Sequence, residues 1–160
     1  MNHKRCLLTR KPRQRQSSKT ITEDKIRGKK MNRTKAREYA FILIFEYRFQ
    51  PDEIETILTN FIEEYQPGNQ QSYIETVVRG VAENIDVIDK KIEEMSKTWE
   101  KDRISCVSIA ILRLAIYEIM MCSDIPFPVS VNEAVALAKK YEGEDAVPFV
   151  NGILGKINKV

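Results

Sequence analysis

Apolar residues recur at intervals of three and four along most of the chain, the spacing of one face of an α-helix. A first helix is predicted over about residues 33–49. Pro51-Asp52-Glu53 then predicts the start of a second helix, with proline at its first position and acidic residues in its first turn. Pro67-Gly68-Asn69 ends that helix. A third runs over residues 73–85 and continues or bends into an apolar stripe that reaches Met95.

The segment 104–122 is the most apolar part of the chain. Its few polar interruptions are Ser105, Ser108, Arg113 and Glu118. Hydrophobicity on all sides predicts a central helix that its neighbours cover. Arg113 near the middle argues against a membrane span. We expect it to form a structural ion pair, with a direct contact to a partner molecule as the alternative.

The carboxy-terminal part predicts two further helices. Residues 124–128 are expected to form a loop, because two prolines block helix continuation. Ser130-Val131-Asn132-Glu133 then resembles a capping box, in which the serine side chain accepts an early backbone N–H. That helix ends at Gly143, and a last one runs from about Asp145. No strand-like alternation of useful length occurs, so the predicted fold is all-α with about seven helices.

Gly80 lies inside the third predicted helix. A glycine in a helix interior costs about 1 kcal/mol relative to alanine. Close approach of a second helix is therefore the expected reason for this residue.

Charge divides the 160-residue chain into two unequal parts. Residues 1–30 hold eleven Lys and Arg against Glu23 and Asp24, whereas the other 130 residues hold 15 basic and 21 acidic groups. We expect a disordered basic arm (1–30) before a folded domain (31–160). Such asymmetry favours a polyanionic partner such as nucleic acid. The alternatives are a merely solubilising arm and a true start of translation at Met31.

Most catalytic chemistry lacks its residues here. The sole histidine is His3, and Cys6, Cys106 and Cys122 show no paired spacing. Phosphate-binding, dinucleotide-binding, zinc and serine-hydrolase motifs are absent from the sequence. We therefore expect no enzyme activity, cofactor or metal, two cysteines that act as small core residues, and a reduced, cytoplasmic setting without membrane association.

The positive signal is a basic cluster, Lys29-Lys30-Met31-Asn32-Arg33-Thr34-Lys35-Ala36-Arg37, that leads into the first predicted helix. Arg33 and Arg37 are four residues apart and so share a helix face. Such a face can hold phosphates while the arm before it folds on contact. We expect Arg33, Lys35 and Arg37 all to lie on exposed surface.

Several blocks of sequence resemble the NusB transcription antitermination family. They are Arg37-Glu38-x-Ala40, Gly80-Val81, Ile111-Leu112-Arg113-Leu114-Ala115-Ile116-Tyr117-Glu118, Asp124-Ile125-Pro126, Val131-Asn132-Glu133-Ala134-Val135-x-Leu137-Ala138-Lys139 and Phe149-Val150-Asn151-Gly152-Ile153-Leu154. The resemblance spans residues 33–157 in consistent order, and the last three blocks together are highly specific. Residues 1–30 lie outside it.

The resemblance implies a fold of two packed helical bundles and a function without catalysis. It implies binding of boxA RNA together with the small-subunit ribosomal protein NusE. The complex would join a transcribing RNA polymerase with other Nus factors and favour read-through, notably in ribosomal RNA operons. The RNA-binding residues carried over by position are Lys30, Arg33, Lys35, Arg37, Phe45, Asp145, Phe149 and Asn151. Relatives often have tyrosine where this chain has Phe45, which keeps base stacking but loses a hydroxyl hydrogen bond.

Alternatives remain open for several of these residues. Phe149 could be a core residue, Asp145 a helix N-cap, and Asn151 with Gly152 a local structural feature. The chain as a whole could instead be a detached RNA-targeting domain of a methyltransferase system. A protein–protein interaction module, including a homodimer, is the alternative of a different class.

Overall fold

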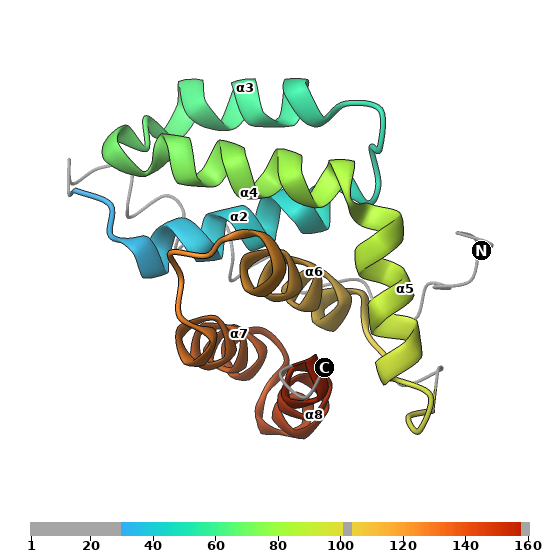
Figure 1. Cartoon of the computed structure of the whole chain (residues 1–160). Helices are drawn as coiled ribbons and strands as arrows, with labels where there is room; N and C mark the ends of the chain where they lie inside the picture. The colour runs from blue at the N-terminus through green and yellow to red at the C-terminus, as the bar shows by residue number, and fades with distance from the viewer. Residues whose placement is uncertain (1–29, 101–103, 158–160) are drawn as a thin grey trace.

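The computed structural model describes residues 30–100 and 104–157, and these form a helical protein (Figure 1). Seven α-helices occur in the described ranges: α2 (Arg33–Tyr47), α3 (Ile54–Tyr65), α4 (Gln71–Glu83), α5 (Ile85–Met95), α6 (Cys106–Met121), α7 (Phe127–Glu142) and α8 (Val147–Ile157), with short 3-10 turns η1 (Gly68–Gln70) and η3 (Glu144–Ala146). No strand occurs in those ranges, and the all-α prediction is confirmed. The predicted arm, apart from Lys30, lies outside the described residues.

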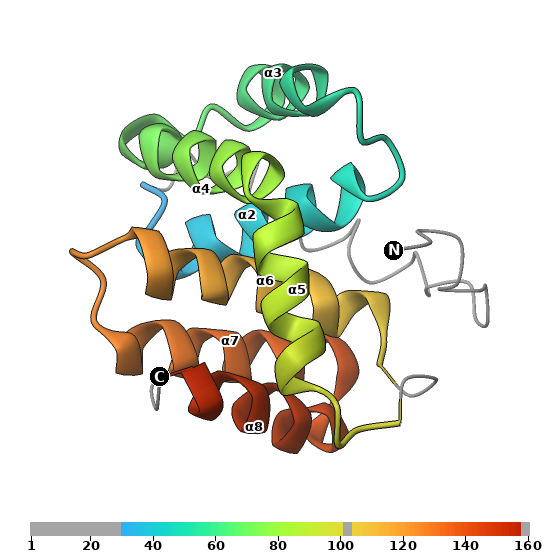
Figure 2. The same ribbon diagram turned by 45° about the vertical axis from the view of Figure 1, so that its right-hand side comes forward.

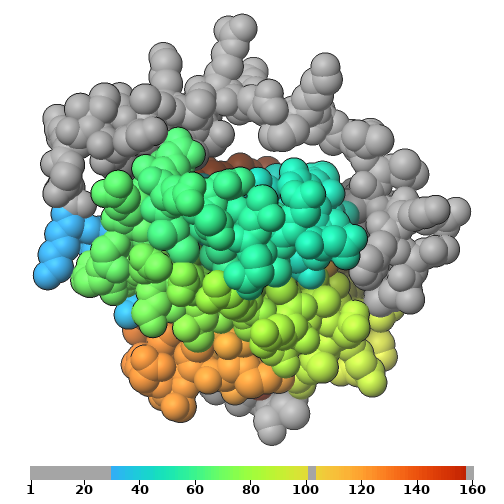
Figure 3. All heavy atoms as spheres, turned by 90° about the horizontal axis from the view of Figure 1, so that it is seen from above, coloured from blue at the N-terminus to red at the C-terminus, as the bar shows by residue number. Residues whose placement is uncertain are grey.

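The helices form two bundles around a shared central helix. Helices α2, α3 and α4 pack on one another, and α5, α7 and α8 surround the other side of α6 (Figures 1 and 2). Helix α6 also contacts α2 and α4, so a single hydrophobic cluster runs from Ala36 to Leu154. Seen from above in Figure 3, α3 spreads across the outer face of the first bundle. The predicted pair of bundles and the central helix are both confirmed.

Helix α6 approaches α4 closely at Gly80. A Cβ atom built at this glycine would lie 2.1 Å from Cζ of Tyr117, which is far inside van der Waals contact. The tyrosine ring therefore occupies the space that a side chain at position 80 would need. The prediction of close helix approach is confirmed.

Arg113 of α6 forms a two-pronged ion pair with Asp89 of α5. Its Nε and Nη2 atoms donate to the two carboxylate oxygens at 2.8 and 2.7 Å. Both side chains are largely buried, and the pair ties the two helices together. The structural interpretation of Arg113 is confirmed.

Two predicted helix starts near prolines are wrong. Helix α3 begins at Ile54 because Pro51 and Asp52 belong to a turn that the Glu53 N–H closes onto the Gln50 carbonyl at 3.1 Å. Helix α7 begins at Phe127, inside the segment expected to be a loop. Proline is tolerated in the first turn of a helix, where backbone N–H groups have no intrahelical partner.

The predicted capping box is also wrong. Ser130 lies inside α7, and Pro126 precedes the first helical residue. The Ser130 side chain is buried and donates to Oε2 of Glu118 at 2.7 Å. The Ser130 hydroxyl therefore hydrogen-bonds to a buried carboxylate on another helix and does not cap the start of its own helix.

Three further observations concern predictions made from composition. Cys106 and Cys122 are only half-buried, so they are less enclosed than core residues. The described helices include none long and apolar enough to cross a membrane. Within the same ranges, no cluster of three His, Cys, Asp or Glu residues is placed to hold a metal ion.

Candidate nucleic-acid interface

A buried carboxylate organises the structure behind the basic cluster. Glu118 of α6 is 1% exposed and accepts hydrogen bonds from Arg37 of α2, Tyr73 of α4 and Ser130 of α7. Nε of Arg37 lies 2.9 Å from Oε1 of Glu118. A buried charge is tolerated when it is paired and its oxygens are hydrogen-bonded, and both conditions hold here.

Arg37 is therefore not on the surface, and the prediction that it is exposed is wrong. Its residue is 5% exposed, and its guanidinium group faces Glu118 in the interior. The spacing of four correctly places it on the face of α2 that also carries Arg33. Neighbouring helices cover this face at the second turn of α2, where Arg37 lies. Only the first turn, with Arg33, is open to solvent.

Arg33 occupies that open first turn. Its side chain is exposed, and its guanidinium carbon lies 4.0 Å from the centre of the Tyr73 ring, in cation–π geometry. Burial and the Glu118 carboxylate raise the pKa of Tyr73, so its hydroxyl stays protonated and donates to Glu118. Tyr73 thus connects the exposed Arg33 to the buried network.

Glu38 gathers a second group of cations on the next turn of α2. Its carboxylate lies 3.1 Å from Nζ of Lys35 and 2.6 Å from Nζ of Lys140, and it accepts a hydrogen bond from the Tyr141 hydroxyl. Burial by itself would raise the pKa of Glu38, but the bonds from Lys140, Tyr141 and Lys35 outweigh it and hold the pKa below its usual value. Lys140 keeps about half of its side chain exposed.

Lys140 and Tyr141 were missed by reasoning from the sequence. Lys140 shows only the common preference for basic residues in the last turn of a helix. Its partner Glu38 lies 102 residues away in the sequence, and no local sequence pattern indicates a contact between residues so far apart.

Helices α2 and α7 contact each other where they cross, since α2 lies across the view in Figure 1 whereas α7 is foreshortened. Thr34, in the first turn of α2, donates to Glu133 near the middle of α7 at 3.1 Å. Further along, the Phe41 and Tyr141 rings meet edge to face with centroids 4.9 Å apart. We call this contact the α2–α7 seam. It places Lys140 beside the basic first turns of α2.

The aromatic candidates differ in their accessibility. Phe45 is half-buried and meets Phe49 edge-on at 5.4 Å, and Phe49 is 65% exposed. Phe149 is 8% exposed and packs edge-on against Trp99 at 5.2 Å. The core interpretation of Phe149 is thereby favoured, and Trp99 is the exposed aromatic residue at this place, which the sequence reasoning passed over.

The two polar candidates at the carboxy-terminal end are both exposed. Asp145 lies within η3, after the end of α7, and Asn151 lies on α8. Lys30 and Arg33 are also exposed and Lys35 is half-buried, so five of the eight candidates offer polar groups to solvent. Exposed groups of these kinds can bind phosphates and base edges.

Comparison with known proteins identifies the family. The model of the NusB family matches residues 34–159, which is most of the chain. The chain belongs to the NusB family. The transcription antitermination protein NusB of Acetivibrio thermocellus is 50% identical over 131 residues, covering 81% of this chain and 90% of that protein. The NusB protein of Clostridium acetobutylicum is 46% identical over 128 residues, covering 79% and 95%.

Solved NusB structures share the fold. A T. maritima NusB structure is 36% identical, with a TM-score of 0.73 over 82% of this chain and 93% of that chain. A NusB chain from a crystal structure of NusB and NusE in complex with double-stranded RNA is 28% identical, with a TM-score of 0.70 over 79% and 96%. The family resemblance is confirmed. The relatives are named as transcription antitermination proteins and not as enzymes, in agreement with the prediction of a non-catalytic role.

Proposed function

We propose that this chain is a transcription antitermination factor that binds boxA RNA together with ribosomal protein NusE. The complex joins elongating RNA polymerase and other Nus factors in the cytoplasm and favours read-through, notably of ribosomal RNA operons. The main support is the match to a NusB chain that was crystallised with NusE and RNA. That match covers 79% of this chain and 96% of that chain.

In this proposal the basic residues hold the RNA backbone. The cations at the start of α2 are Lys30, Arg33 and Lys35, and α7 adds Lys140 on the other side of the α2–α7 seam. In this proposal the cations of both segments contact phosphates. Arg37 contributes indirectly, because its ion pair with Glu118 fixes the second turn of α2.

Groups further along α2 and in the segment that follows α7 discriminate bases in this proposal. The Phe45 ring stacks on an unpaired base, and Asp145 and Asn151 offer hydrogen bonds to base edges. Phe149 acts from beneath, because it supports the exposed ring of Trp99.

Titration of labelled RNA tests the proposal. A boxA-like RNA and a scrambled RNA of equal length are titrated with the full chain, with and without purified NusE. We expect tighter binding of the boxA-like RNA, and a larger difference between the two RNAs when NusE is present. Equal affinity for both RNAs in the presence of NusE would contradict the proposal. Light scattering of the same samples reports whether a homodimer forms, which is the result expected of an interaction module.

A further inference from the structure

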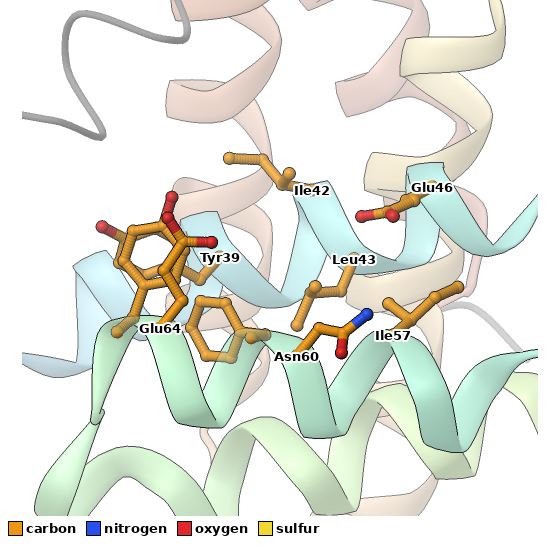
Figure 4. A pocket seen from close by; sticks show the side chains of 9 residues that line it. Tyr39, Ile42, Leu43, Glu46, Ile57, Asn60 and Glu64 are labelled. Atoms are coloured by element: carbon orange, nitrogen blue, oxygen red, sulfur yellow. The ribbon is translucent and has the colours of Figure 1, made fainter.

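A groove between α2 and α3 lies outside the surface proposed for RNA. Its volume is about 220 Å³, and Figure 4 shows its lining from the two helices. Leu43, Ile57 and Phe61 give it an apolar floor. Glu46 and Glu64 stand toward opposite ends, because α2 and α3 are antiparallel and Tyr39 meets Tyr65 at the Glu64 end.

The charge around this groove is negative. Residues 51–65, which contain α3, hold five acidic residues and no Lys or Arg. Nor does a Lys or Arg occur in the lining of the groove as the structure describes it. An apolar floor between two exposed carboxylates suits an apolar side chain that has cations on both sides.

The chain carries such a sequence shortly before α2. Lys25-Ile26-Arg27 places one branched apolar residue between two cations, in a stretch that ends just before α2. In an extended segment, the middle side chain points toward the groove and the long flanking side chains can bend back to its rim.

The length of chain also fits. From Arg33, the first residue of α2, to Tyr39, where the groove begins, the rise along the helix is about 9 Å at roughly 1.5 Å per residue. An extended chain covers about 3.3 Å per residue, so roughly three residues return over this distance. Counting back from Lys30, that length ends at about residue 27, so a chain that returns along α2 would bring Arg27 to the Glu64 end of the groove and Lys25 further toward Glu46.

We propose that the α2–α3 groove binds residues 25–27 of the same chain, with Ile26 on the apolar floor, Arg27 paired with Glu64 and Lys25 paired with Glu46. The groove thereby anchors the basic arm to the first bundle. The inference concerns a contact within the protein and does not depend on the proposed RNA function.

Photo-crosslinking of the full chain tests the contact. A benzoylphenylalanine replaces Asn60, an exposed residue in the lining of the groove, and mass spectrometry identifies the crosslinked peptides. The control carries the same group at Lys90, an exposed residue of α5. We expect crosslinks to the peptide containing residues 25–27 from position 60, in a yield about tenfold above position 90. Equal yields from the two positions would overturn the proposal.

Charge reversal tests the pairing. In the chain with the crosslinker at position 60, the double change Glu46→Lys and Glu64→Lys replaces two attractions by repulsions. We expect the yield of this crosslink to fall about tenfold, the factor that corresponds to about 1.4 kcal/mol. The matched control is Glu83→Lys with Asp86→Lys, two exposed acids at the junction of α4 and α5, and we expect no change. A similar decrease in both double variants, or in neither, would overturn the proposal.

Two further measurements complete the test. Circular dichroism melting of every variant shows that the fold is intact, so a weaker crosslink reports the contact itself. Crosslinking of a mixture of ¹⁴N- and ¹⁵N-labelled chains separates contacts within a molecule from contacts between molecules. Crosslinks joining light to heavy chains would show that a second copy supplies the arm, which contradicts the proposal.

Discussion

Arg37 and Glu118 form an ion pair in the interior, where neither side chain has much contact with water. Each residue therefore neutralises the charge of the other. Removing one partner of a buried pair leaves the other uncompensated. We expect Arg37→Met to lower the free energy of unfolding by about 3–5 kcal/mol. Urea unfolding followed by circular dichroism measures it. Arg33→Ala, on the same helix face but exposed, serves as the control and is expected to change stability by at most about 0.5 kcal/mol. Equal effects of the two substitutions would contradict this assignment.

The ring of Tyr73 holds the Arg33 guanidinium in place, and this role can be separated from its hydrogen bond to Glu118. We expect Arg33→Ala to weaken RNA binding by about 2–10-fold, because a cation that binds phosphate is removed, with melting temperature nearly unchanged. Tyr73→Phe keeps the ring, so RNA affinity should persist while stability falls by about 1–3 kcal/mol. Tyr73→Leu removes the ring and should reduce both.

Fluorescence anisotropy with labelled RNA, well below each melting temperature, measures these affinities. In an Arg33→Ala background, Tyr73→Leu should bring no further decrease in affinity. An additional decrease would mean that the tyrosine acts on RNA binding by another route.

Glu38 makes stability depend on pH in the acid range. Its folded-state pKa lies below the usual value, so its contribution is present above the usual pKa and is lost as pH falls through the folded-state pKa. We expect Glu38→Gln to be less stable than the parent at pH 7, with the difference narrowing below about pH 4.5. Urea midpoints between pH 7 and pH 3 measure it. Glu55→Gln is the control, since Arg79 also lowers the pKa of Glu55 but water screens that exposed pair.

These residues show how far local sequence reasoning reaches into the site. The basic run before α2 is visible as composition, and its position at a helix start follows from the apolar period. The burial of Arg37 cannot be predicted in this way, because its partner Glu118 lies 81 residues away on another helix. Local sequence does not determine how those two helices pack. The same holds for Lys140, which is an ordinary helix-end lysine until Glu38 is found beside it.

At the scale of the helix, the contact between α4 and α6 depends on the missing side chain at Gly80. Alanine is favoured over glycine in a helix by about 1 kcal/mol, but its methyl group would collide with the Tyr117 ring. We expect Gly80→Ala to destabilise the parent chain and to stabilise a Tyr117→Ala chain by up to about 1 kcal/mol. A double-mutant cycle in urea measures the difference. Equal effects of Gly80→Ala in both backgrounds would show that the ring gives way without cost.

The helices themselves were predictable, and their ends were less so. Each α-helix of the structure has an apolar period of three to four residues that tertiary packing then buries. Pro126 and Pro128 predict a loop, yet the helix begins between them because a first turn needs few backbone donors. Local rules for prolines and serines describe several structures equally well, and the packing of neighbouring helices decides among them.

At the scale of the molecule, the arm and the folded body are expected to contribute differently to RNA binding. The hydrophobic cluster of the described residues runs from Ala36 to Leu154, so we expect deletion of residues 1–30 to leave the body folded. The slope of log K, the logarithm of the binding constant, against log salt is negative. It should become shallower by about 0.7 for each phosphate of single-stranded RNA that the arm no longer neutralises. Binding of scrambled RNA should therefore weaken and become less salt-dependent, while the preference for boxA persists.

Affinities for both RNAs at several salt concentrations measure these quantities for the full and the shortened chain. Circular dichroism of the shortened chain provides the control for folding. If the preference for boxA disappears with the arm, the arm itself reads the RNA sequence.

The arrangement around Glu118 also bears on the order in which a growing chain can fold. Arg37, Tyr73 and Ser130 are separated from Glu118 by 81, 45 and 12 residues, and Ser130 is the last of the four to be synthesised. Domains tend to fold from the amino terminus during synthesis. Here α2 and α4 leave the ribosome with Arg37 still lacking its buried partner, so the first bundle cannot close around its charged centre until α6 and the start of α7 have emerged. A ribosome that stalls before residue 118 would therefore hold a helical intermediate in which the hydrogen bonds to Glu118 have not formed.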